Sequence, residues 1–145
     1  MDILLIFAWV IAAFIAMAFW EAYIEGKHPW AGAGTTWKLK IGKKYSITGY
    51  HFWFYVFLMF TFSLPFIICG FSYRLLGVLI SAVAVGLVVE DFLWYVVNPH
   101  FAVLKHWNPR DAYWYPWLVI GKFKIPWPDV IGILIAVISY IILWR

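Results

Sequence analysis

Charged residues are scarce in this chain of 145 residues. Asp, Glu, Lys and Arg together make up only 12% of it, whereas 66% of the residues are hydrophobic. A soluble domain carries roughly 25% charged residues. The composition therefore excludes an ordinary soluble domain and predicts an integral membrane protein.

Cysteine is also nearly absent, and the common catalytic motifs are missing. Cys69 is the single cysteine, which excludes an internal disulfide and a multi-thiolate zinc site. There is no His-Glu-x-x-His and no Gly-x-Ser-x-Gly, and the segment "AGAGTTWK" lacks the Gly-Lys-Ser/Thr ending of a P-loop. Four histidines are too few for the histidine clusters of membrane desaturases. Nothing beyond the basic isoelectric point favours nucleic acid, so we expect no nucleic-acid partner.

Long apolar runs are the dominant feature that is present. The first, Ile3 to Trp20, contains 18 consecutive apolar residues, enough for a transmembrane helix. Only helices satisfy the backbone of such runs in lipid. We therefore predict an all-α polytopic membrane protein, in which residues 1–145 form one domain, a four-transmembrane-helix bundle. The expected spans cover residues 3–25, 51–71, 75–97 and 128–144.

The two long connections between these runs, residues 26–50 and 98–129, are basic. They hold nine of the eleven Lys and Arg residues, so the positive-inside rule places both in the cytoplasm and both termini outside. We expect a multi-pass protein of the inner or plasma membrane. Alternating apolar and basic residues around Gly42 and Gly121 predict two short hairpins, and apolar spacing within 101–107 predicts a short interfacial helix.

Two adjacent acids, Glu90 and Asp91, interrupt the third apolar run. An acid at the centre of a membrane helix costs roughly 2.5–3.5 kcal/mol, so we expect both side chains to have partners. The first run ends in Glu21, Glu25 and His28, whose i, i+4, i+7 spacing places them on one helix face. The Glu-x-x-His spacing within this set is that of carboxylate-bridged metal sites in helix bundles.

These acids and the histidines predict a divalent-metal site at the cytoplasmic end of the bundle. Mixed carboxylate and imidazole ligands suit zinc, iron or manganese. In an enzyme, a metal-activated water would attack a lipid-like or small hydrophobic substrate, with Glu90 or Glu21 as general base. The candidate ligands are Glu21, Glu25, His28, Glu90, Asp91, His100, His51 and His106.

Three other interpretations remain open from the sequence. The same acids could bind a cation or a proton in a transporter or channel subunit. They could pair with nearby Lys and Arg in a network without metal. The chain could also be a structural, oligomeric membrane module, in which case its partner is a second copy of itself.

Aromatic residues make up 23% of the chain, including 11 tryptophans. This exceeds what interfacial belts usually need, so we expect part of the set to wall a cavity near the acids and the rest to contact membrane lipid. The candidates for either role are Trp20, Trp30, Trp53, Trp94, Trp107, Trp114 and Trp117.

The segment "VEDFLWYVVNP", residues 89–99, resembles a stretch found in a group of small four-span prokaryotic membrane proteins of unassigned function. The resemblance includes the segment with Glu21, Glu25 and His28, and so covers the ends of the first and third expected spans. It implies that these two segments are a shared feature of the group, and it implies no activity.

Overall fold

A computed structural model describes residues 2–27, 37–41 and 45–144 of the chain. Within these residues the fold is all-α in its main elements, with two small hairpins added. The helices are α1 (Ile3–Glu25), α2 (Gly49–Cys69), α3 (Tyr73–Val97), α4 (Val103–His106) and α5 (Trp127–Leu143).

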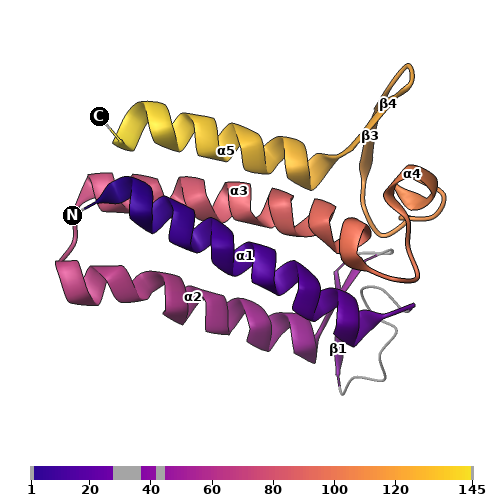
Figure 1. The fold of residues 1–145 in the computed structure, drawn as a ribbon, viewed down its shortest axis with the longest axis horizontal. Helices are drawn as coiled ribbons and strands as arrows, with labels where there is room; N and C mark the ends of the chain where they lie inside the picture. The colour runs from indigo at the N-terminus through magenta and orange to yellow at the C-terminus, as the bar shows by residue number, and fades with distance from the viewer. Residues whose placement is uncertain (1, 28–36, 42–44, 145) are drawn as a thin grey trace.

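The four long helices lie side by side (Figure 1). The helix α3 contacts α1 on one side and α5 on the other. The helix α2 joins through aromatic side chains, as in the stacking of Phe62 on Phe14 with ring centroids 5.4 Å apart. Both termini lie at one end of the molecule and the hairpins at the other, which we call the hairpin end (Figure 1).

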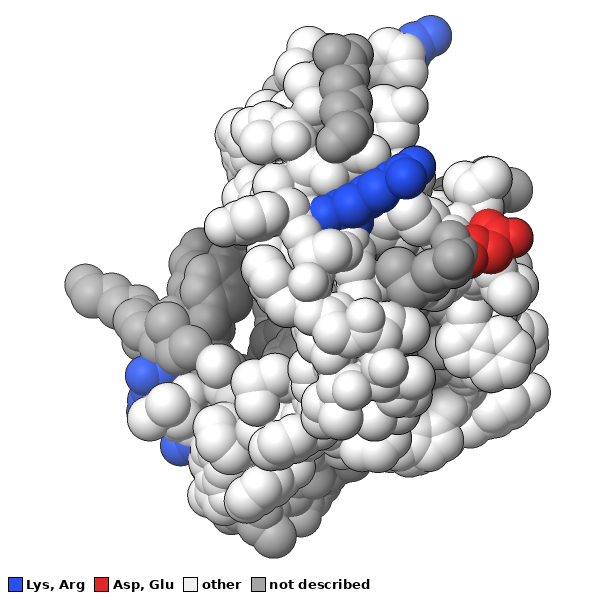
Figure 2. Space-filling view, turned by 90° about the vertical axis from the view of Figure 1, so that its left-hand side faces the viewer, with Lys and Arg blue, Asp and Glu red and all other residues white. Residues whose placement is uncertain are grey.

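Three of the helices, α1, α2 and α3, are long and apolar enough to cross a membrane. Their 21 to 25 residues correspond to about 32–38 Å of helix, against a hydrocarbon core about 30 Å thick. Large apolar side chains face outward along α2, including Phe60 and Ile67. The surface at the end with both termini is mostly uncharged (Figure 2). Length and surface together indicate a membrane protein.

Local sequence signals set the helix boundaries. The Asp2 carboxylate accepts hydrogen bonds from the backbone N–H groups of the first turn of α1, and Gly26 ends that helix with φ +55°. The side chains of Thr48 and Ser72 cap α2 and α3 in the same way. The expected helices over 3–25 and 75–97 are therefore found with nearly the same bounds. The second begins two residues earlier than expected, at Gly49, because Thr48 is its cap.

Small residues let α3 approach both of its neighbours closely. A Cβ added at Gly86 would lie 2.1 Å from the Phe14 ring of α1, and one added at Gly132 of α5 would lie 3.1 Å from a carbonyl oxygen of α3. The hydroxyl groups of Ser81 and Ser139 each donate a hydrogen bond to a backbone carbonyl across the α3–α5 contact. This is the packing mode that helices use in lipid, where small and hydroxyl-bearing residues replace large apolar ones.

Both expected hairpins are present. In the first, β1 (Lys38–Ile41) pairs antiparallel with β2 (Tyr45–Thr48) and leads directly into α2. In the second, β3 (Trp117–Ile120) pairs antiparallel with β4 (Phe123–Pro126), and Gly121 makes the turn with φ +59°. The short helix expected within 101–107 is only one turn long, α4.

An aromatic cluster covers the hairpin end of α3. Trp94 and Tyr95, both buried, contact each other edge to face with centroids 4.9 Å apart. The Tyr95 ring meets that of Trp107 at 5.0 Å and stacks on that of Trp114 at 6.4 Å. The segment between α4 and β3 is thereby held against the helix ends.

Candidate functional site: a carboxylate-lined cavity

A cavity of about 320 Å³ lies at the hairpin end of the long helices. Its walls come from α1, α2, α3, the first turns of α5 and the segment 114–116. Among the described residues, no Lys or Arg lines it. Five acids do, namely Glu21, Glu25, Glu90, Asp91 and Asp129.

Two of these acids, one from α1 and one from α3, meet inside the cavity. The carboxyl groups of Glu21 and Glu90 lie within hydrogen-bonding reach of each other. The Tyr50 hydroxyl donates a second hydrogen bond, 3.0 Å long, to Oε1 of Glu21. Like charges this close repel each other unless a cation or a proton is shared between them. The α1–α3 contact thus creates a place that favours positive charge.

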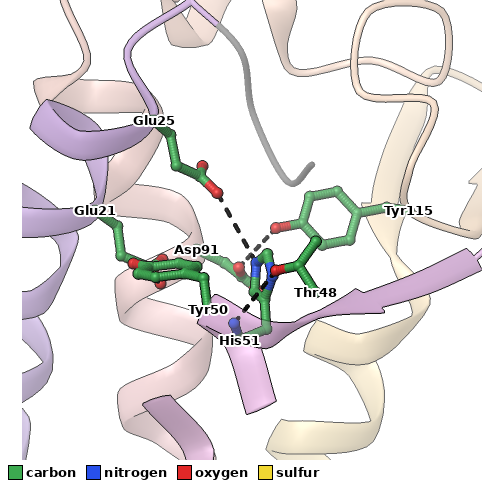
Figure 3. Close-up of polar contacts among 7 residues, drawn as sticks. All are labelled: Glu21, Glu25, Thr48, Tyr50, His51, Asp91 and Tyr115. Carbon is green, nitrogen blue, oxygen red and sulfur yellow. Dashed lines mark hydrogen bonds and ion pairs between the residues drawn. The ribbon is translucent and has the colours of Figure 1, made fainter. Parts of the chain in front are cut away.

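The imidazole of His51 is held in a fixed orientation beside the third acid (Figure 3). Its Nδ1 lies 2.7 Å from the Thr48 hydroxyl, and its Nε2 lies 3.9 Å from Oε1 of Glu25. The side chain is buried, 4% exposed. A second partner that holds one ring nitrogen and orients the other is a common arrangement around metal-binding histidines.

The fourth acid, Asp91, is tied to the segment before the second hairpin. The Tyr115 hydroxyl donates a 2.6 Å hydrogen bond to its Oδ1 (Figure 3). Burial, followed by the negative charge of Asp91, raises the pKa of Tyr115 well above its ordinary value of 10.0. Tyr115 therefore stays a hydroxyl donor at all physiological pH values, and it fixes the 114–116 segment over the cavity.

Four side-chain polar atoms in the described residues are buried without a hydrogen-bond partner, and all four belong to residues that line this cavity. A buried polar group left unpaired costs about 1–3 kcal/mol, so the surroundings of this cavity favour a ligand that can form hydrogen bonds. The atoms are Oε1 of Glu90, Nε1 of Trp94, the hydroxyl oxygen of Tyr95 and Oδ1 of Asp129.

Most of the residues proposed from the sequence come together here. Five of the eight candidate ligands line the cavity, namely Glu21, Glu25, His51, Glu90 and Asp91. His28 lies outside the described residues. The structure places His100 and His106 elsewhere: His100 is exposed near Gly26, and Nδ1 of His106 accepts a hydrogen bond from the Ala102 N–H at 2.8 Å.

Sequence reasoning missed several members of the site. The sequence pattern predicts Asp129 on the same side of the membrane as the other acids, and this was the signal available for it. The tyrosines that donate to Glu21 and Asp91 had no such signal, because any aromatic residue near a span end resembles an interfacial anchor. Trp94 and Trp114, two of the tryptophans expected near a cavity or at the interface, do line this one.

The described residues contain no group of three or more His, Cys, Asp or Glu side chains placed to hold a metal ion. The strongest pair is Glu25 with His51. For Glu21, Glu90, Asp91 and Asp129, the structure shows no ion pair with any described Lys or Arg. The interactions found for the first three are with tyrosines or with each other. This arrangement can bind a cation, a proton or a ligand with hydrogen-bond donors.

No protein-family model, curated protein or solved structure matches the chain.

Proposed function

We propose that this chain is a four-span membrane protein that binds a divalent metal ion in the cavity at its hairpin end. The observation that carries the proposal is the His51–Glu25 pair. Ligand atoms lie about 2.0–2.2 Å from zinc, so two ligands of one tetrahedral ion are roughly 3.3–3.6 Å apart. The observed 3.9 Å between Nε2 and Oε1 requires only a small side-chain rotation.

The neighbouring acids supply the rest of the proposed coordination. Glu21 and Glu90 line the same cavity, and Oε1 of Glu90 has no hydrogen-bond partner. A divalent cation would offset the mutual repulsion of these acids. His28, three residues after Glu25 in the chain, stays a candidate ligand from the sequence.

The fourth span in this proposal is α5. Its 17 residues make about 25 Å of helix, slightly short of the hydrocarbon core, and the β3–β4 hairpin joins it at the membrane surface. Four crossings agree with the position of both termini at one end (Figure 1). The basic hairpin end would face the cytoplasm by the positive-inside rule.

The core between the cavity and the opposite end favours binding or catalysis over transport through the protein. Apart from Ser81 and Ser139, which donate hydrogen bonds across the α3–α5 contact, the buried residues described there are apolar. Six of them pack in one cluster, namely Val10, Phe14, Leu58, Leu75, Leu79 and Ala82. A carrier needs polar groups along its whole path. If the protein is an enzyme, a bound metal ion would activate a water molecule, and Glu90 or Glu21 would be the general base.

The test is elemental analysis of protein purified without chelator and then equilibrated with zinc, iron(II) or manganese. We expect about one metal ion per chain in the wild type, and less than about 0.1 in Glu25→Gln and in His51→Gln. The matched controls are Asp111→Asn and His106→Gln, which make an acid-to-amide change and a His-to-Gln change outside the cavity and should keep the metal.

Two results would contradict the proposal. Less than about 0.1 metal ion per wild-type chain after resupply would exclude the metal site. Full metal content in both Glu25→Gln and His51→Gln would exclude the ligand assignment. Circular dichroism of each variant shows whether it has kept its helices.

A further inference from the structure

The unpartnered side-chain atoms of the residues that line the cavity include hydrogen-bond donors as well as acceptors. The indole N–H of Trp94 can only donate, and the hydroxyl of Tyr95 can donate or accept. Oε1 of Glu90 and Oδ1 of Asp129 accept. A bare metal ion would satisfy the two acceptors and leave the Trp94 N–H without a partner. The cavity therefore has a feature that the proposed metal site does not explain.

The charge of the cavity restricts what can bind there. Five carboxylates and, among the described residues, no Lys or Arg surround the space. An anionic group such as a phosphate or a carboxylate would meet uncompensated repulsion. The ligand must bring positive charge near the acids, and it must also bring a neutral oxygen or nitrogen that can accept from Trp94.

The walls and the volume of the cavity further restrict the kind of ligand that it can bind. Six aromatic residues line the cavity: Phe54, Tyr55, Trp94, Tyr95, Trp114 and Tyr115. Aromatic rings beside carboxylates are the surroundings that organic ammonium groups favour, through cation–π attraction. A volume of about 320 Å³ lies at the lower end of the range for small-molecule sites, roughly 300–1,000 Å³.

From these observations we infer that the cavity binds a small amino alcohol, whose ammonium group lies among the acids and whose oxygen accepts a hydrogen bond from Trp94. The four residues with unpartnered atoms are at least nine-tenths buried, with exposures of 1% for Tyr95, 5% for Glu90 and Trp94, and 7% for Asp129. The inference goes beyond the metal site and does not depend on it. A free amino alcohol and the amino-alcohol end of a lipid headgroup share the ammonium group and the oxygen. In the lipid this oxygen also carries an anionic phosphate, which must lie away from the acids.

The first experiment titrates detergent-solubilised protein, in a maltoside that carries no ammonium group, with three related probes. Choline has both the charge and the hydroxyl, tetramethylammonium lacks the hydroxyl, and 3,3-dimethyl-1-butanol lacks the charge. Binding is followed by calorimetry and tryptophan fluorescence. We expect choline to bind at least about tenfold more tightly than either of the others, which corresponds to the loss of one hydrogen bond or more.

Variants test the residues. Trp94→Phe keeps an aromatic ring but removes the N–H, so it should weaken choline about tenfold and leave tetramethylammonium unchanged. Asp129→Asn should weaken both cations. The matched controls are Trp53→Phe, on the exposed side of α2, and Asp111→Asn, outside the cavity; both should bind as the wild type does.

A second experiment distinguishes the two sources of the ligand. The protein is placed in nanodiscs of phosphatidylcholine, phosphatidylethanolamine or phosphatidylglycerol, and retained lipid is measured by native mass spectrometry. Selective retention of the first two, reduced by Asp129→Asn, identifies a lipid headgroup. Choline binding without selective retention identifies a free amino alcohol.

Three outcomes would overturn the inference. They are equal binding of choline and 3,3-dimethyl-1-butanol, no binding of choline together with no lipid selectivity, and wild-type binding by both cavity variants. The first two need only the wild-type protein, so a variant that fails to fold leaves the inference open to refutation. Repeating the choline titration on metal-free and metal-supplied protein separates the two proposals, since choline binding without metal binding would refute only the metal site.

Discussion

The contact between Gly86 of α3 and Phe14 of α1 provides a quantitative test of the packing that forms the site. A Cβ at position 86 would lie 2.1 Å from Cδ2 of the Phe14 ring and 2.6 Å from Cγ and Cε2. Carbon atoms prefer separations of about 3.5–4.0 Å. The ring cannot easily move away, because Phe14 is fully buried and stacks on Phe62. Gly86→Ala must therefore push α1 and α3 apart.

The expected size of the effect is the difference between two terms. Overpacking of a filled core costs typically about 1–3 kcal/mol, and the large overlap here places the cost at the upper end. Alanine is favoured over glycine within a helix by about 1 kcal/mol. We expect Gly86→Ala to lower the free energy of unfolding by about 1–2 kcal/mol. In a Phe14→Ala background the ring is gone, so the same change should be neutral or stabilising.

The assay is a double-mutant cycle on the free energy of unfolding in mixed micelles, with wild type, Gly86→Ala, Phe14→Ala and the double variant. The expected coupling between the two sites is about 2 kcal/mol. A coupling below about 0.5 kcal/mol, or a Gly86→Ala protein as stable as the wild type, would refute the close α1–α3 contact. Because the same contact brings Glu21 to Glu90, Gly86→Ala should also weaken the proposed binding of zinc in the cavity.

Three further predictions follow from the hydrogen bonds of the described residues. Thr48→Val removes the hydroxyl that orients the His51 imidazole. It should weaken the proposed zinc binding about 10–100-fold in a competition titration, whereas Thr48→Ser, which keeps a hydroxyl, should bind zinc as the wild type does. Ser139→Ala removes a 3.0 Å bond across the α3–α5 contact and should lower the free energy of unfolding by about 0.6 kcal/mol, while Ser63→Ala, which loses only a local bond, should change it less. Because the pKa of Tyr115 is raised in the folded protein, its contribution to stability is complete below pH 10 and falls as the pH rises further. Between about pH 9 and pH 11, the free energy of unfolding should therefore decrease less steeply with pH for Tyr115→Phe than for the wild type.

The sequence by itself determined the class of the protein and the position of its helices. Long apolar runs can satisfy their backbone in lipid only as helices, and caps such as Asp2 and Ser72 fix the boundaries locally. The hairpins were predictable for the same reason, since a glycine between two short alternating segments is a local signal. Interruption of an apolar run by Glu90 and Asp91 also identified the region of the site without any knowledge of the fold.

Only the tertiary structure decided how the polar groups are partnered. Glu21 and Tyr50 are 29 positions apart in the chain, and Asp91 and Tyr115 are 24 positions apart. No sequence pattern links the members of either pair, because these contacts arise from the packing of whole helices. The same packing closes a cavity around Trp94, Tyr95 and Asp129, while His100 and His106, which look equally suitable as ligands in the sequence, lie outside it. Residue type and span position indicate which groups are costly to bury, but the approach of the helices at small residues such as Gly86 selects which of them meet.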